Sequence, residues 1–188
     1  MQTFFNTTNI YDDIQSVLSI SEWLRAIAGE LVVDATVSSL GYKEFFRQLE
    51  EFELGRAGKR TRTINIQAKS LEVLLPASLV DVEQCVHILM SELFGSERPL
   101  PYVALLETKG KGRYLQILIS ERYYSAEPIV YEDYWKSDRY QNKVTGRLCK
   151  ADDPQARKIV QAGDLRKTWT SHFSLKSRIF TADGYARK

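Results

Sequence analysis

The chain has 188 residues, of which 44% are hydrophobic and 27% are charged, a composition typical of a globular protein with a buried core. Lys and Arg outnumber Asp and Glu by only 26 to 24, so the net charge does not by itself indicate a nucleic-acid partner. No apolar run approaches the roughly 20 residues of a membrane-spanning helix, and residues 1–5 lack the features of a secretory signal. Cys85 and Cys149 have no metal-site spacing, which indicates free thiols, and we expect a cytoplasmic protein without a membrane partner.

The first third of the chain predicts helices around one strand. Apolar residues at helical spacing cover 11–18, and Ser21 fits the N-cap of a second helix that ends near Gly29. Residues 31–37 are rich in valine and predict a strand. A further helix is expected over 42–52, with its phenylalanines facing inward.

A dense basic run follows that helix. Its cations are Arg56, Lys59, Arg60 and Arg62, and the two neighbouring glycines give the segment conformational freedom. One interpretation is a solvated surface loop, since basic loops are common on protein surfaces. The other is a loop that contacts phosphates at the edge of a groove.

The middle of the chain predicts a strand within 63–76, a helix over 80–93 and then a β-hairpin. The hairpin has apolar strands over 102–106 and 114–119, joined by the turn Lys109-Gly110-Lys111-Gly112. Side chains alternate across a strand, so Tyr114, Gln116 and Leu118 share one face while Leu115, Ile117 and Ile119 share the other. If the odd-numbered aliphatic residues face a core, the even-numbered polar residues face a groove beside a basic turn.

The cations of that turn have two interpretations. Lys109, Lys111 and Arg113 could contact a charged ligand such as DNA, or could only keep a solvated turn soluble.

Residues 123–150 combine aromatic and basic side chains. Tyrosines that stack on unpaired bases and cations that meet phosphates suit single-stranded nucleic acid, although rings that seal a sheet edge are equally common. The candidate DNA-binding cations here are Lys136, Arg139, Lys143 and Arg147. After them, Pro154 at a first helical turn predicts a final helix that continues, past a break at Gly163, to about residue 180.

The hairpin resembles a known family. Leu100-Pro101-Tyr102 before the first strand and Ile117 to Arg122 at the end of the second, with its Ile-Ser-Glu-Arg tail, are similar to the metal-binding hairpin of MobA/MobL-type plasmid relaxases of the HUH endonuclease class. The resemblance covers about residues 69–180. It implies a DNA-binding protein of conjugation or plasmid mobilization, with DNA and other mobilization or replication proteins as partners.

The chain departs from the family at the metal site. Family members carry one histidine on the first hairpin strand and a His-X-His pair on the second, and these positions fall here on Glu107, Tyr114 and Gln116. Glu107 and Gln116 offer oxygen ligands for Mg²⁺ or Mn²⁺, but a neutral phenol such as that of Tyr114 is a poor ligand. We therefore favour loss of the metal site over a rebuilt one. By position in the family pattern, Tyr42 is the first candidate for the nucleophilic tyrosine and Tyr11 the second.

Together these features predict one relaxase-like α+β domain over 1–188, with 1–30 as a possible helical appendage. We expect an antiparallel sheet of about four to five strands with helices mainly on one face. Three functions stay open. The first is a protein that binds single-stranded or hairpin DNA with weak or lost nicking activity. The second is a metal-dependent nickase or replication initiator with a rebuilt Glu/Gln site. The third is a non-catalytic protein-interaction module.

Overall fold

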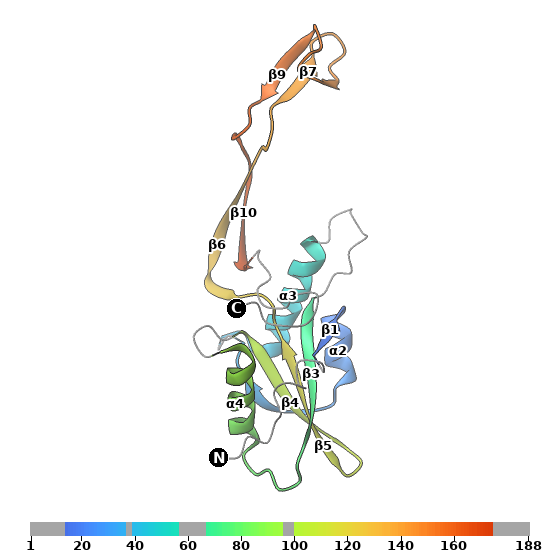
Figure 1. Ribbon diagram of the computed structural model, residues 1–188, viewed down its shortest axis with the longest axis vertical. Helices are drawn as coiled ribbons and strands as arrows, with labels where there is room; N and C mark the ends of the chain where they lie inside the picture. Colours follow the sequence, from blue (N-terminus) through green and yellow to red (C-terminus); the bar gives the residue numbers. More distant parts are fainter. Residues whose placement is uncertain (1–13, 37–38, 57–66, 96–99, 175–188) are drawn as a thin grey trace. The chain divides into compact units, whose positions relative to one another are not determined.

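The computed structural model describes residues 14–36, 39–56, 67–95 and 100–174 (Figure 1). The chain divides into two compact units. The first, here called the sheet unit, comprises Met1–Ala126 and Phe173–Lys188, and the second, the ribbon unit, comprises Glu127–His172. In the described residues, three helices and ten strands confirm the expected α+β class.

The sheet unit contains a five-stranded antiparallel sheet, as the sequence predicts. The strand order is β1-β3-β5-β4-β2, so the hairpin of β4 and β5 lies at its centre. The strands are β1 (Gln15–Val17), β2 (Glu30–Asp34), β3 (Ala68–Leu75), β4 (Tyr102–Lys109) and β5 (Gly112–Ile119). The turn at Gly110 has a φ of +63°, a left-handed conformation that glycine adopts without steric cost.

Three helices accompany this sheet: α2 (Ile20–Ala26), α3 (Tyr42–Arg56) and α4 (Val82–Phe94). The N-cap of α2 is Ser19 rather than the expected Ser21, since the Ser19 side chain accepts a hydrogen bond from the backbone N–H of Glu22. Asp81 caps α4 in the same way, and Gly95 ends it.

The helices pack on both faces of the sheet, so the expectation that they lie mainly on one face holds for α2 and α3 but not for α4. On one face, α4 covers the odd-numbered residues of β5, including Leu115, Ile117 and Ile119. On the opposite face, α2 and α3 cover a second core that includes Leu105 and Leu118 (Figure 1). Both faces of the central strands are apolar over part of their length, which is what allows two helical layers.

Aromatic rings dominate the core under α3. Phe45 lies 5.1 Å from Phe46, 5.4 Å from Phe173 and 5.5 Å from Tyr124, measured between ring centroids. Phe52 lies 5.4 Å from Phe173 on another side. These rings come from α3 and from the segments where the chain leaves and re-enters the sheet unit.

The ribbon unit has no hydrophobic core of its own. It contains β7 (Arg139–Asn142), β8 (Leu148–Cys149) and β9 (Ala156–Val160) in the order β8-β7-β9, together with most of β6 (Tyr124–Tyr134) and β10 (Leu165–Phe173), which pair with each other. All residues from 127 to 172 are described, and none of them is buried. Hydrogen bonds in the ladders and contacts between exposed side chains therefore hold this unit together.

Two predicted helices are strands. The described part of the segment expected to be a helix, residues 154–174, forms β9 and β10, with a left-handed turn at Gly163 (φ +93°). The last residues of that prediction, 175–180, lie outside the described residues. Its aliphatic residues do not face a core, and its run of threonine and tryptophan fits a strand better than a helix. Within the first predicted helix, residues 15–17 instead form edge strand β1 against β3.

Candidate functional site

One half of the sheet face under α3 is apolar, and the other half carries polar side chains. The register places Glu72 of β3 opposite Gln116 of β5, and Glu107 of β4 opposite Tyr114 of β5. We call Glu72, Glu107, Lys109, Tyr114 and Gln116 the polar face. Leu115, Ile117 and Ile119 are buried on the other side, as the alternation predicts. The even-numbered face is polar at Tyr114 and Gln116 but apolar at Leu118, and Gln116 is buried rather than facing a groove.

Gln116 lies at the centre of the polar face with only 4% of its surface exposed. Its side-chain amide donates hydrogen bonds to the carboxylates of Glu72 and Glu107, the latter at 3.3 Å. A buried amide with two acceptors is fixed in position, because losing either partner would leave a polar group without a hydrogen bond.

Lys109 places a positive charge between the same two carboxylates. Its Nζ lies 3.0 Å from Glu72 Oε2 and 3.1 Å from Glu107 Oε2, and 5.4 Å from the centroid of the Tyr114 ring. The hydrogen bond from Lys109, and next that from Gln116, hold the pKa of the Glu72 carboxyl below its ordinary value. Hydrogen bonds to Glu107 and then Glu72 raise the pKa of Lys109 in turn.

The polar face, as it is arranged, does not fit a divalent metal ion. An ammonium already bridges its two carboxylates, and the amide of Gln116 directs NH₂ rather than oxygen toward them. In the part of the chain that the structure describes, no group of three or more His, Cys, Asp or Glu side chains is arranged to hold a metal. Neither histidine lies on this face: His87 is on α4 and His172 on β10.

Tyr42, the first candidate nucleophile, is the first residue of α3. Its backbone N–H donates a 2.8 Å hydrogen bond to Asp34 Oδ2, which joins the end of β2 to the start of the helix. The ring is half-buried against the core under α3, the same side of the sheet as the polar face. Tyr11, the second candidate, lies outside the described residues.

The cations of the hairpin turn differ in whether their side chains already have partners in the chain. Lys109 is engaged by two carboxylates, and Arg113 donates a 2.9 Å hydrogen bond to the Leu79 carbonyl, whereas Lys111 is exposed. In the basic run after α3, Arg56 is the last residue of the helix, and Lys59, Arg60 and Arg62 lie outside the described residues.

The Ile-Ser-Glu-Arg tail of β5, which carries the family resemblance, has a structural role. The guanidinium of Arg122 pairs with Glu53 of α3, and Glu121 lies 3.8 Å from Lys69 of β3. Ser120 accepts a hydrogen bond from the Arg122 backbone at 3.0 Å and donates one to its carbonyl at 2.9 Å. The tail therefore ties the central strand to a helix and to a neighbouring strand.

In the ribbon unit, cations lie over aromatic rings. The guanidinium carbons of Arg139 and Arg166 lie 4.3 and 4.9 Å from the centroid of Trp135, and Lys167 Nζ lies 4.6 Å from that of Trp169. Tyr131 stacks on Trp169 at 5.8 Å. The remaining predicted DNA-binding residues, Lys136, Lys143 and Arg147, are exposed.

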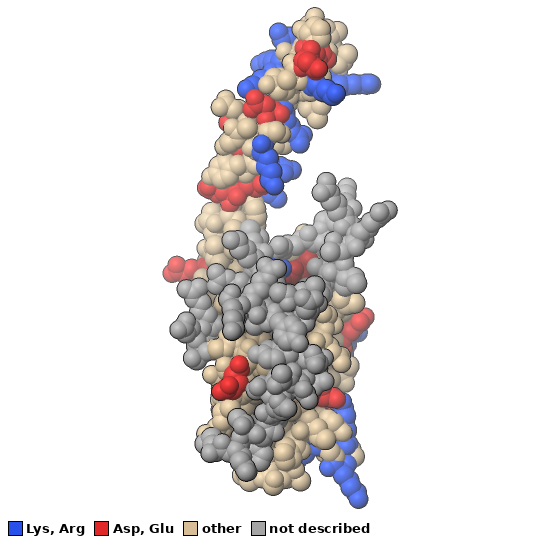
Figure 2. Space-filling model, in the orientation of Figure 1, with Lys and Arg blue, Asp and Glu red and all other residues tan. Residues whose placement is uncertain are grey.

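Charge is distributed unequally between the two units. The ribbon unit carries nine Lys and Arg against seven Asp and Glu, whereas the rest of the chain has equal numbers of each. Figure 2 shows lysine and arginine side chains along the length of the ribbon unit. Its positive charge is mild, and some of its cations are engaged: Lys158 pairs with Asp138, and Arg166 lies 3.2 Å from Asp133.

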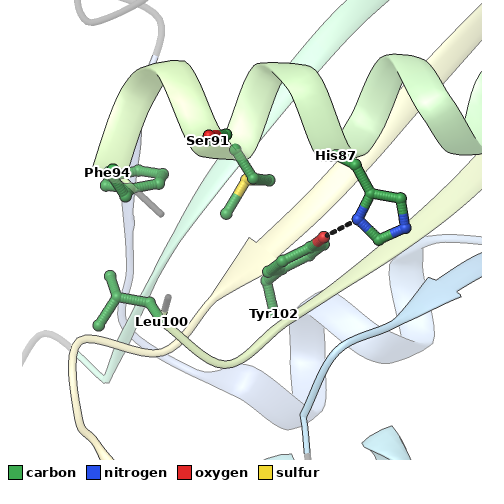
Figure 3. Close-up of a pocket in the computed structure, with 7 residues that line it drawn as sticks. His87, Ser91, Phe94, Leu100 and Tyr102 are labelled. Carbon is green, nitrogen blue, oxygen red and sulfur yellow. Dashed lines mark hydrogen bonds between the residues drawn. The ribbon is translucent and has the colours of Figure 1, made fainter. Parts of the chain in front are cut away.

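A separate cavity of about 200 Å³ lies between α4 and the start of β4 (Figure 3). It is lined by His87, Met90, Ser91, Phe94, Gly95, Leu100 and Tyr102. The Tyr102 hydroxyl and His87 Nδ1 are 3.2 Å apart and hydrogen-bonded, and burial raises the pKa of Tyr102. Tyr102 and His87 thus satisfy each other, and apart from Ser91 the rest of the wall is mainly apolar.

The sequence did not single out Glu72, Lys69, Glu53 or the bridging role of Lys109. Glu72 stands at a polar, even-numbered position of β3, and this alternation is a signal that could have placed it on the Gln116 face. The pairing of Arg122 with Glu53, 69 residues apart, has no local signal.

Comparisons with known proteins leave the family open. No family model matches the sequence, and comparisons with curated proteins and with solved structures give no match. The relaxase resemblance therefore stays a prediction. None of the described helices is long and apolar enough to cross a membrane, and both cysteines are free, Cys85 buried and Cys149 half-exposed.

Proposed function

We propose that the chain is a relaxase-like DNA-binding protein of a plasmid or other mobile element, which binds single-stranded or hairpin DNA with weak or lost nicking activity. The observation that carries the proposal is the bridge from Lys109 to Glu72 and Glu107. Lys109 and Glu107 lie on the hairpin where the family resemblance implies a metal, and Glu72 lies on the neighbouring strand β3. The bridge engages the two carboxylates that stand near the positions where the family has histidine ligands.

DNA binding is assigned to the ribbon unit and the exposed hairpin turn. Lys136, Lys143, Arg147 and Lys111 are exposed cations on strands and turns, suited to phosphate contacts. The rings of Trp135 and Trp169 are already covered by cations or by another ring, so contacts to the sugar-phosphate backbone are expected to outweigh base stacking.

Fluorescence anisotropy with a labelled single strand, a hairpin and a blunt duplex of matched length tests the proposal. We expect the single strand or the hairpin to bind more tightly than the duplex, with affinity that falls steeply as salt increases. In Mg²⁺ or Mn²⁺, the labelled strand is expected to stay uncut. Efficient cutting would favour the metal-dependent nickase or initiator.

A protein-interaction module is the second candidate, and one observation favours it. The ribbon unit exposes aliphatic side chains that no core uses, among them Val144 with 78% and Leu148 with 64% of its surface exposed. If the chain binds none of the three oligonucleotides at low salt, DNA binding is excluded and this second function is supported.

A further inference from the structure

The polar face holds a cation that belongs to the chain itself. Lys109 Nζ makes contacts of 3.0 and 3.1 Å with carboxylate oxygens from two strands that flank β5. Two carboxylates that converge on one point would repel each other without a positive charge between them. The lysine supplies this charge from the hairpin turn.

We propose that Lys109 is a resident counter-ion that keeps divalent cations off the polar face, and that removing its ammonium converts the face into a site for Mg²⁺ or Mn²⁺. The ligands would be carboxylate oxygens of Glu72 and Glu107 and, after rotation of its amide, the side-chain oxygen of Gln116. Hard cations of this kind take oxygen ligands and complete their shell with water.

The geometry of the three strands supports the ligand set. Glu72 and Gln116 are directly paired across β3 and β5, and Glu107 of β4 lies within 3.3 Å of the Gln116 amide. All three side chains are thus supplied by adjacent strands of the sheet. Gln116 is paired on both sides, with β3 and β4, whereas Glu72 and Glu107 are paired on their β5 side.

The net charge of the polar face explains why Lys109 decides whether a divalent ion binds there. With Lys109 in place, the polar face has a net charge of −1, and a divalent ion would have to displace an ammonium that is tethered to the chain. Without the ammonium the charge is −2, which a divalent ion neutralises. Glu72 is half-exposed, so water can reach the site to complete the coordination shell.

Lys109 can be replaced without disturbing the core. Its side chain is 47% exposed at the end of β4, next to the turn at Gly110. Lys109→Met keeps an unbranched side chain of similar size but removes the charge, and with it the contact of the ammonium with the Tyr114 ring. Lys109→Arg keeps the charge and is the matched control.

Isothermal titration of the full chain with MnCl₂ tests the proposal. We expect Lys109→Met to bind one Mn²⁺ with an apparent Kd at least about ten times lower than that of the unsubstituted chain or Lys109→Arg. The double variant Glu107→Gln/Lys109→Met is expected to lose this gain in affinity for Mn²⁺. Thermal unfolding with and without MnCl₂ gives a second readout, in which only Lys109→Met is stabilised by the ion.

Two results would overturn the inference. The first is Mn²⁺ binding by the unsubstituted chain as tight as that of Lys109→Met, because the lysine would then exclude nothing. The second is a cooperatively folded Lys109→Met variant that binds no Mn²⁺. Neither result depends on DNA binding, so failure here is distinguishable from failure of the proposed function.

Discussion

The guanidinium of Arg122 donates a hydrogen bond to the carboxylate of Glu53, and both side chains are almost fully buried, with exposed fractions of 9% and 4%. The pair connects the end of β5 to α3. Removing one partner of a buried ion pair leaves an uncompensated charge, so we expect Arg122→Met to lower the free energy of unfolding by about 3–5 kcal/mol in urea titrations.

The double variant Glu53→Met/Arg122→Met is the control for this pair. It removes both charges at similar volume, and we expect it to be more stable than Arg122→Met alone. If the single variant costs less than about 1 kcal/mol, the ion pair does not have the structural role assigned to it.

Phe173 anchors the point where the chain re-enters the sheet unit. It is 3% exposed and contacts the rings of Phe45, Phe52 and Tyr124. We expect Phe173→Ala to cost about 3–5 kcal/mol of unfolding free energy, since it leaves a cavity among aromatic rings. Val130→Ala, at an exposed position of β6, is the matched control and is expected to change stability by less than about 0.5 kcal/mol.

The central hairpin could be predicted from the sequence because its signal is local. Alternation along 114–119 predicts which side chains of β5 share a face, and the glycines of the turn predict where the chain reverses. It does not predict that the even-numbered residues Gln116 and Leu118 are also buried. The register that brings Glu72 beside Gln116 joins strands 44 residues apart and depends on the whole sheet. For that reason the sequence alone does not identify Glu72 and Glu107 as the partners of Lys109.

The ribbon unit was predicted poorly for the opposite reason. Residues 154–174 have apolar side chains at intervals that also suit a helix, and helix prediction assumes that those side chains are buried. In the structure Ile159 and Leu165 are exposed, and pairing of β9 with β7 and of β10 with β6 decides the conformation. Pairing between distant segments overrides local periodicity here.

Low pH should weaken the ion pair between Lys109 and Glu72 on the polar face. The folded-state pKa of Glu72 is lowered from an ordinary value of 4.5, so its contribution to stability is present above that value and is lost as pH falls through the folded-state pKa. We therefore expect the melting temperature of the unsubstituted chain to fall more between pH 6 and pH 3 than that of Glu72→Gln, by roughly a few degrees. Equal falls in melting temperature for the two proteins would show that the ion pair of Lys109 with Glu72 adds no stability.

The same bridge has a consequence at high pH. The raised pKa of Lys109 means that its contribution is present below the ordinary value of 10.5 and is lost as pH rises through the folded-state pKa. Lys109→Met should therefore lose less stability than the unsubstituted chain above that pH. Thermal unfolding of both proteins over the alkaline range measures this difference.

Phosphate contacts by the ribbon unit can be counted from salt dependence. For a single-stranded oligonucleotide, each phosphate contact contributes about 0.7 to the slope of log affinity against log salt. We expect Lys143→Gln to reduce that slope by about this amount. Arg25→Gln removes the same charge from an exposed position of α2 and is expected to leave the slope unchanged. Equal slopes for all three proteins would remove Lys143 from the DNA interface.

Tyr42 offers the decisive test between lost and retained nicking. Its backbone is fixed by Asp34 and its ring is half-buried against the core, while on the same side of the sheet the Lys109 ammonium bridges the two carboxylates of the polar face. Attack by a tyrosine hydroxyl on a phosphate is helped by a metal that polarises the phosphate, and bridged carboxylates are poorly placed to hold one. We therefore expect no covalent protein–DNA adduct on a denaturing gel after incubation with a labelled single strand and Mn²⁺, for the unsubstituted chain and for Tyr42→Phe alike. An adduct that forms with the unsubstituted chain and disappears in Tyr42→Phe would instead establish Tyr42 as a nucleophile and support the nickase.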